Sequence, residues 1–279
     1  MLKRIPLVLL LLLALPALAD DYYLIEMNAV GQPVVQYGNC LNLFWDADAV
    51  FYNMTSQTEV VTLAGVSNGA VIAGLPASLN VPPSRATSLR QAIGIPWAPQ
   101  SAPPMWVVHV TAPSSLLVES AMIPGLAASD RCLWVHFLQQ YGKTQLPVFR
   151  SLVPASQRQL IGGLSVGDAA GHINVAIYNA GAEPATATIE VHRACDGAVT
   201  ETRNVTIDAN TAQQFTGFAI PDGSGACAPL DPSAATKRLA YVLATVDQPS
   251  LTFASVLGVA SETDNQPLST IQVMPGVAR

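Results

Sequence analysis

The chain carries little charge. Only 11% of its 279 residues are Asp, Glu, Lys or Arg, against roughly 25% in ordinary globular proteins. The net charge is −6, and no cluster of Lys and Arg occurs after the first few residues. Nucleic acids are bound by basic surfaces because their phosphates are anionic. We therefore expect no nucleic-acid partner.

Metal and redox motifs are also missing. The sequence contains no HExxH motif and no CxxC spacing, which are the usual signs of zinc and redox sites. Asp46-Ala47-Asp48 offers two carboxylates, fewer oxygens than a calcium loop requires. The histidines follow no ligand spacing; they are His109, His136, His172 and His192. We expect neither a metal nor a cofactor.

The only long apolar run lies at the N-terminus. Lys3 and Arg4 precede an apolar stretch from Ile5 to Leu18, and Ala17-Leu18-Ala19 places small residues where a signal peptidase cuts. The run is shorter than the roughly 20 apolar residues of a membrane-spanning helix. We predict a cleaved signal peptide over residues 1–19. The mature chain is then exported to the periplasm, the cell surface or the medium, with no membrane span.

Four cysteines follow the predicted cleavage point, at Cys40, Cys132, Cys195 and Cys227. Exported chains meet an oxidising environment, so disulfides are expected. Four cysteines allow three pairings. The domain organisation below favours Cys40–Cys132, which closes a loop of 132 − 40 = 92 residues, together with Cys195–Cys227.

Two stretches of the chain resemble each other. Tyr52-Asn53 matches Tyr178-Asn179 at an offset of 179 − 53 = 126 residues, and the same offset aligns Thr62-Leu63 with Thr188-Ile189 and Val81 with Ile207. Further on, Val118-Glu119-Ser120 resembles Phe253-Ala254-Ser255 at an offset of 255 − 120 = 135. Matches in the same order over a domain length predict a duplication. The expected domains are 20–142 and 143–279, the second opening with a strand around Leu146–Phe149.

Alternation of side chains predicts strands. Ile173, Val175 and Ile177 alternate with Asn174, Ala176 and Tyr178, a period of two that turns one row inward and the other toward solvent. Turn signals separate such runs, at Asn68-Gly69, Pro82-Pro83 and Asp196-Gly197; Asn-Gly and Asp-Gly fit type I′ hairpins. No long amphipathic helix is visible after the signal. The pattern predicts an all-β chain of two antiparallel sandwich domains.

The second copy resembles a known class of modules. Tyr178-Asn179-Ala180-Gly181, then a run of alternating Ala, Thr, Ile and Val, then Asp196-Gly197, is similar to immunoglobulin-like modules of secreted bacterial proteins. The resemblance covers most of the second copy and, more weakly, the first. It implies spacers or binding modules, and it indicates fold better than function.

These features favour a non-catalytic protein of the cell envelope that acts in binding, adhesion or scaffolding, with a protein or glycan partner. Long loops on rigid scaffolds often carry function. Trp97 lies on such a Pro- and Gly-rich stretch together with Ile93 and Ile95, so these three residues are the candidate contacts. Alternatively, Trp97 folds back and caps the edge of a sandwich.

One motif suggests an enzyme. Gly65-Val66-Ser67-Asn68-Gly69 fits G-x-S-x-G and resembles the nucleophile region of secreted esterases and polyester depolymerases. The resemblance implies Ser67 as nucleophile and one of the four histidines as base. The motif requires a following helix, which Gly74-Leu75-Pro76 interrupts. Because Asp196-Gly197 repeats the turn without a serine, a hairpin is the favoured interpretation.

A periplasmic pilus-type chaperone is a third hypothesis. Such chaperones have two sandwich domains after a signal peptide and offer a strand edge to a subunit. The resemblance implies basic residues in the cleft between the domains. Arg85 and Arg90 are the candidates, whereas the early strand Tyr22–Ile25 lacks the expected arginine.

Overall fold

The computed structural model describes residues 19–33, 41–67, 70–71, 75–89, 105–128, 139–140, 144–166, 172–219, 238–257 and 271–278. The regular elements in these ranges are β-strands, and their pairings are antiparallel, so the predicted all-β class is confirmed. None of the described segments is a helix long and apolar enough to cross a membrane. The predicted signal peptide lies outside the described residues except for Ala19.

The first half of the chain forms two sheets. Its strands are β1 (Ala19–Pro33), β2 (Leu41–Asn53), β3 (Glu59–Ser67), β4 (Ala70–Val71), β5 (Ser78–Val81), β6 (Arg85–Ser88), β7 (Met105–Pro113), β8 (Leu116–Ala128), β9 (Gln139–Gln140), β10 (Thr144–Leu146) and β11 (Val148–Phe149). Sheet I has the order β11-β1-β7-β3, with β4 and β5 on β3. Sheet II has the order β6-β2-β8-β10, with β9 on β8. Strand β1 joins them, because Ala19–Met27 pairs with β7 whereas Asn28–Pro33 pairs with β2.

The second half forms two further sheets. Its strands are β12 (Arg158–Val166), β13 (His172–Asn179), β14 (Ala185–Arg193), β15 (Val199–Ile207), β16 (Thr211–Ala219), β17 (Arg238–Val246), β18 (Ser250–Leu257), β19 (Ile271–Pro275) and β20 (Val277–Ala278). Sheet III has the order β16-β13-β18-β19, and sheet IV has the order β15-β14-β17-β12-β20.

The strand pairings of the two halves correspond. In each half the last segment passes from one sheet to the other: β10 pairs with β8 and β11 with β1, just as β19 pairs with β18 and β20 with β12. The segment Leu146–Phe149, expected to open the second half, therefore closes the first. The boundary placed at residue 142 is wrong for this reason, and the halves divide after Phe149.

The register corrects one sequence match. Asn53 lies opposite Leu116 and Asn179 lies opposite Ser250, so this part of the chain has an offset of 250 − 116 = 134 residues and not 135. The match of Val118-Glu119-Ser120 to Phe253-Ala254-Ser255 is therefore displaced by one residue. In a strand, such a slip exchanges the two faces of the sheet.

Each half has its own hydrophobic core between its two sheets. Phe51, Leu24 and Val110 are among the buried residues between sheets I and II. Ile189, Phe218 and Val242 are among those between sheets III and IV. The row Ile173, Val175 and Ile177 faces this second core, as its alternation predicts.

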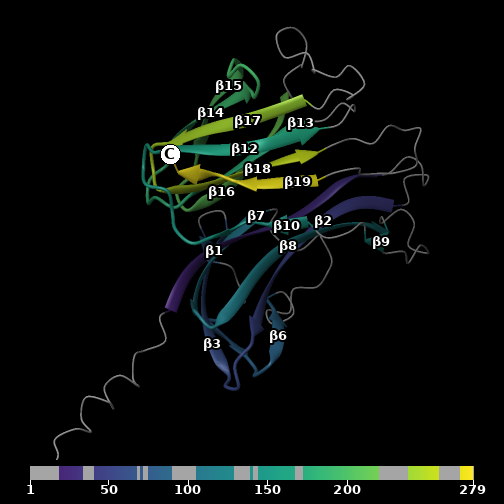
Figure 1. The fold of residues 1–279 in the computed structure, drawn as a ribbon, viewed down its shortest axis with the longest axis vertical. Coiled ribbons are helices and arrows are strands. Elements are labelled where there is room, and N and C mark those ends of the chain that lie inside the picture. Colours follow the sequence, from purple (N-terminus) through teal and green to yellow (C-terminus); the bar gives the residue numbers. More distant parts are fainter. Residues whose placement is uncertain are drawn as a thin grey trace, which may run out of the picture.

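A third cluster joins the halves. The row expected to face solvent is buried instead: Asn174 is 4%, Ala176 1% and Tyr178 7% exposed. The reason is that this outer face of sheet III packs on the outer face of sheet I, in a cluster that contains Val107, Leu146, Phe149, Ala176, Tyr178, Ala212, Leu251 and Phe253, with Tyr23 against it. In Figure 1 the halves lie one above the other, with β7 and β10 beside β16 and β19. The sheets are thus layered in the order II, I, III, IV.

One buried asparagine anchors the same turn in each half. Asn53 Nδ2 donates to the carbonyls of Gln57 and Val81, both at 2.8 Å, and its Oδ1 accepts from Thr55 N at 2.8 Å. Asn179 Nδ2 donates to the carbonyls four and 28 residues later, at 2.9 and 3.3 Å, and its Oδ1 accepts from Gly181 N at 2.9 Å. The matching separations explain why Asn occurs at this place in both halves: the amide satisfies backbone groups that would otherwise be buried unpaired.

Candidate interaction surface

Ser67 ends a strand that turns back on itself. Val66 pairs with Val71 and Ser67 with Ala70, so β3 and β4 form a hairpin around Asn68-Gly69. This confirms the predicted hairpin at the motif. A nucleophile elbow needs a strand-to-helix turn that exposes the serine hydroxyl. The local backbone at Ser67 is a strand-to-strand turn.

The type I′ prediction for Asp196-Gly197 is wrong. That turn type needs positive φ at both central residues, and here only Gly197 has it, at 73°. The loop is longer, because Gly197 N donates to Arg193 O at 2.9 Å and Arg193 N donates to Ala198 O at 2.9 Å. Asp196 stabilises it by accepting from Ala198 N at 3.0 Å and pairing with Arg193 at 2.8 Å. The Arg193 guanidinium holds the pKa of Asp196 below its usual value.

The two histidines with described side chains pack on tyrosines. His109 stacks on Tyr23 and His192 stacks on Tyr241, each with ring centroids 4.7 Å apart. Nε2 of His109 lies 3.3 Å from Asp21, and Nε2 of His192 lies 3.5 Å from Glu190. In the part of the chain that the structure describes, no group of three His, Cys, Asp or Glu residues could hold a metal.

The contact between the halves is kept neutral. Burial raises the pKa of the Tyr178 phenol, and Tyr23 raises it further. Burial also raises the pKa of Tyr23, with a contribution from the Asp21 carboxylate. Both hydroxyls therefore stay protonated at neutral pH, which suits an interface with little access to water.

Several predicted site residues lie outside the described residues: Trp97, Ile93, Ile95, Arg90, Cys40, Cys132 and Cys227. Cys195 is disulfide-bonded, and its pairing with Cys227 stays a prediction. Arg85 is exposed at the start of β6 opposite Asn53, whereas the residues that join the halves come from other strands. The structure therefore does not place Arg85 in a cleft between the halves.

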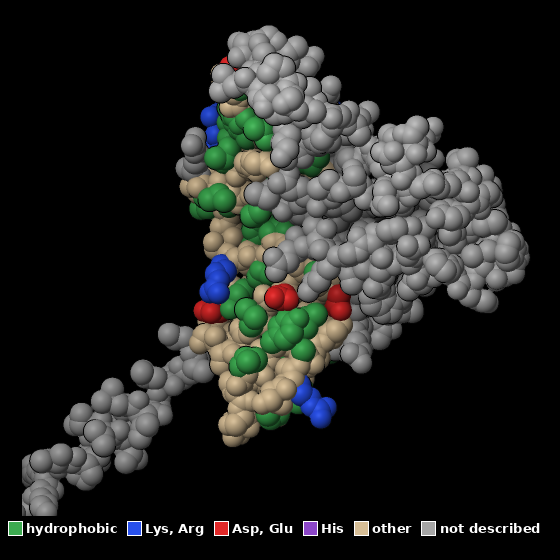
Figure 2. Space-filling model, turned by 45° about the vertical axis from the view of Figure 1, so that its right-hand side comes forward, with side chains coloured by type: hydrophobic (Ala, Val, Ile, Leu, Met, Phe, Trp, Pro, Cys, Tyr) green, Lys and Arg blue, Asp and Glu red, His purple; other side chains and the backbone are tan. Residues whose placement is uncertain are grey.

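The outer face of sheet II carries an apolar group with acidic neighbours. Tyr52 is half-buried between Ala86 on β6 and Leu117 on β8, and Leu117 is 56% exposed. The Tyr52 hydroxyl donates to Glu119 Oε2 at 3.2 Å. Figure 2 shows hydrophobic side chains gathered on the surface of the first half, with acidic side chains beside them. In the sequence Tyr52 stands out only as a mark of the repeat, and no local pattern indicates this surface.

The outer face of sheet IV has an apolar part as well, with Glu190 and His192 beside it on β14. Leu160 lies between Leu243 on β17 and Val277 on β20. Val277 is 63% exposed and Leu239, further along β17, is 50% exposed. Tyr241 lies on the same face of β17, between Leu239 and Leu243. Sequence analysis did not identify this surface either, because single exposed apolar residues are common.

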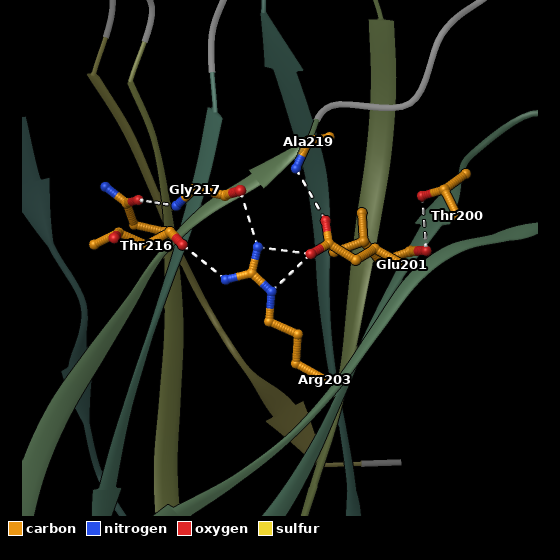
Figure 3. Close-up of polar contacts among 8 residues, drawn as sticks. Thr200, Glu201, Arg203, Thr216, Gly217 and Ala219 are labelled. Carbon is orange, nitrogen blue, oxygen red and sulfur yellow. Dashed lines mark hydrogen bonds and ion pairs between the residues drawn. The ribbon is translucent and has the colours of Figure 1, made fainter.

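An ion pair closes the open side of the second half. Arg203 on β15 donates to the carbonyls of Thr216 and Gly217 on β16, at 2.8 and 2.9 Å, and pairs with Glu201 at 2.6 Å (Figure 3). Glu201 accepts from Ala219 N at 3.1 Å. The guanidinium lies 3.9 Å from the ring centre of the buried Phe218. Charged residues that point inward at a sheet edge hinder the addition of another strand to that edge.

Comparison with known proteins gives little. No family model and no curated protein matches the chain. A solved structure, protein 1070 of Thermotoga maritima, is similar to 45% of this chain over 96% of its own length, at 15% identity and a TM-score of 0.31. A likeness of this size carries no argument about fold or function.

Proposed function

We propose that the chain is an exported, non-catalytic protein of the cell envelope, with two immunoglobulin-like modules, that acts in binding, adhesion or scaffolding. The main support is the buried contact between sheets I and III. It fixes the two halves relative to each other and leaves the outer faces of sheets II and IV available to partners.

The contact between sheets I and III buries enough apolar side chains to hold the two halves in a fixed orientation. Leu251 and Phe253 are at most 1% exposed, and both come from the outer row of β18. Burying one such side chain contributes about 1.5–3 kcal/mol. Several of them together resist separation of the halves, whereas a spacer that only tethers two modules needs no such cluster.

The remaining parts of the proposal come from the sequence. They are a cleaved leader over residues 1–19, a duplicated module, and one disulfide in each half, Cys40–Cys132 and Cys195–Cys227. The corresponding strand pairings and the matched Asn53 and Asn179 contacts support duplication.

A capture experiment tests the function. Mature protein on a resin is incubated with solubilised native envelope, and retained proteins and glycans are identified. Trp97→Ala is expected to lower capture without changing the melting temperature, and Met54→Ala, which alters an 81% exposed residue in another loop, serves as the control. Hydrolysis of a short-chain ester that is lost in Ser67→Ala would contradict the proposal.

A further inference from the structure

The contact between the halves joins two different faces. The outer face of sheet III contributes Ala176, Tyr178, Ala212, Leu251 and Phe253, and the outer face of sheet I contributes Tyr23, Val107 and Phe149. Because the halves have corresponding strands, each covered face has a counterpart in the other half. The counterpart of the sheet III face is the outer face of sheet II, and that of the sheet I face is the outer face of sheet IV.

The uncovered face of sheet II repeats the covered face of sheet III. Tyr178 lies between Ala212 and Leu251, and Tyr52 lies between Ala86 and Leu117. The three residue types are the same. Ala176, next along β13, corresponds to Val50. Two positions gain a carboxylate. Phe253 beside Ala176 corresponds to Glu119 beside Val50, and Asn174, the next residue of that row, corresponds to Asp48.

The uncovered face of sheet IV likewise keeps the apolar character of sheet I. Tyr23 lies between His109 and Phe149, and at the corresponding place Leu160 lies between Leu243 and Val277. The register of β7 and β17 aligns Val107 with Tyr241. No residue type is repeated, Leu243 is 8% exposed and Glu190 lies beside it, so the two faces share only the apolar character around Leu160 and Val277. By the same correspondence, the surface suited to cover an exposed apolar face of one half is the opposite face of another module.

We propose that the sheet IV face of one copy docks on the sheet II face of a second copy and so repeats the contact between the halves. The proposal rests on the proposed binding role and identifies the partner as a second copy of this chain. The two docking faces differ, so the association is head-to-tail and continues from copy to copy without closing by two-fold symmetry. Growth then gives open filaments.

Glu119 limits this association. It places a carboxylate where the covered face has Phe253, so docking must remove that group from water. Its hydrogen bond to Tyr52 offsets part of this cost. The contact between copies is therefore weaker than the contact within a chain, and Glu119→Phe, which restores the residue of the covered face, is expected to tighten it.

Sedimentation velocity of the mature full-length chain tests the proposal. Concentrations up to roughly 1 mM are needed to detect association with a millimolar dissociation constant. Wild type is expected to form species that grow with concentration, and Glu119→Phe to do so at lower concentration. Leu117→Lys and Val277→Lys each block one face and should weaken association at least about 30-fold. Met54→Lys is the control, since Met54 is more exposed than either residue and lies in a loop. Melting curves confirm that each variant is folded.

Mixing the two blocked variants tests the geometry. Leu117→Lys retains the sheet IV face and Val277→Lys retains the sheet II face, so the mixture should form a dimer that does not grow. A wild type that stays monomeric throughout the range, a closed symmetric dimer, or unaltered association of either lysine variant would overturn the proposal. If a monomeric wild type still captured a different envelope component, self-assembly would be refuted while the binding function stood.

Discussion

Removal of the buried amide of Asn179 should strongly destabilise the protein. The side chain is 0% exposed, and Asn179→Ala removes the donor to Glu183 O at 2.9 Å and the acceptor for Gly181 N at 2.9 Å. A lost hydrogen bond costs about 1 kcal/mol, and each buried group left unpaired adds about 1–3 kcal/mol. We therefore expect a loss of about 3–5 kcal/mol, a large share of the roughly 5–15 kcal/mol that stabilises a typical protein.

Chemical denaturation followed by circular dichroism measures this loss as a shift of the urea midpoint. Asn53→Ala should give a loss of similar size, because three of its hydrogen bonds reach groups at the same sequence separations as those of Asn179. Asn179→Asp keeps the acceptor for Gly181 N but buries a carboxylate and sets an oxygen against the carbonyls of Glu183 and Ile207, so its loss should be at least as large as that of Asn179→Ala. Asn204→Ala alters an exposed asparagine with one bond to Thr188 and is the control. A loss below about 0.5 kcal/mol in Asn179→Ala, the range of ordinary surface substitutions, would refute the reasoning.

Three further predictions concern the second half. Arg203→Met should destabilise the protein by about 0.5–1.5 kcal/mol, measured as a lower urea midpoint, because two exposed carbonyls of β16 lose a charged donor, and Arg203→Lys should restore only part of this loss. Gly276→Ala should lower the melting temperature, since its Cβ would clash with the Thr252 hydroxyl and lie 3.0 Å from the Thr252 carbonyl; an unchanged melting curve would contradict that geometry. Arg193 lowers the pKa of Asp196. The ionised Asp196 carboxylate therefore stabilises the folded state fully at pH values above its ordinary pKa of 3.8, and this stabilisation is lost as the pH falls through the lowered pKa. Asp196→Asn should therefore remove part of the acid sensitivity measured by thermal melts between neutral pH and pH values below 3.8.

Local patterns in the sequence determined the strands, the inward rows and several turns. Ile173, Val175 and Ile177 face the core because a period of two places them on one side of a strand wherever that strand lies. The hairpin at Ser67 followed from the turn signal in the same way. The division of the halves was misplaced, because the place of Leu146–Phe149 depends on pairings with distant strands. Leu146 pairs with Ser120 of β8, 146 − 120 = 26 residues away, and Phe149 pairs with Tyr23 of β1, 149 − 23 = 126 residues away.

Tertiary structure alone decided what covers each sheet. Tyr52 and Tyr178 have the same neighbour types on adjacent strands, and their sequences do not reveal that Tyr52 is half-buried on an outer face whereas Tyr178 is 7% exposed against the first half. This difference in exposure arises from packing between sheets, and no local sequence pattern indicates which two sheet faces will pack together. Alternation along the chain thus fixes which residues share a face, whereas the contact between sheets I and III fixes which two of the outer faces pack on each other.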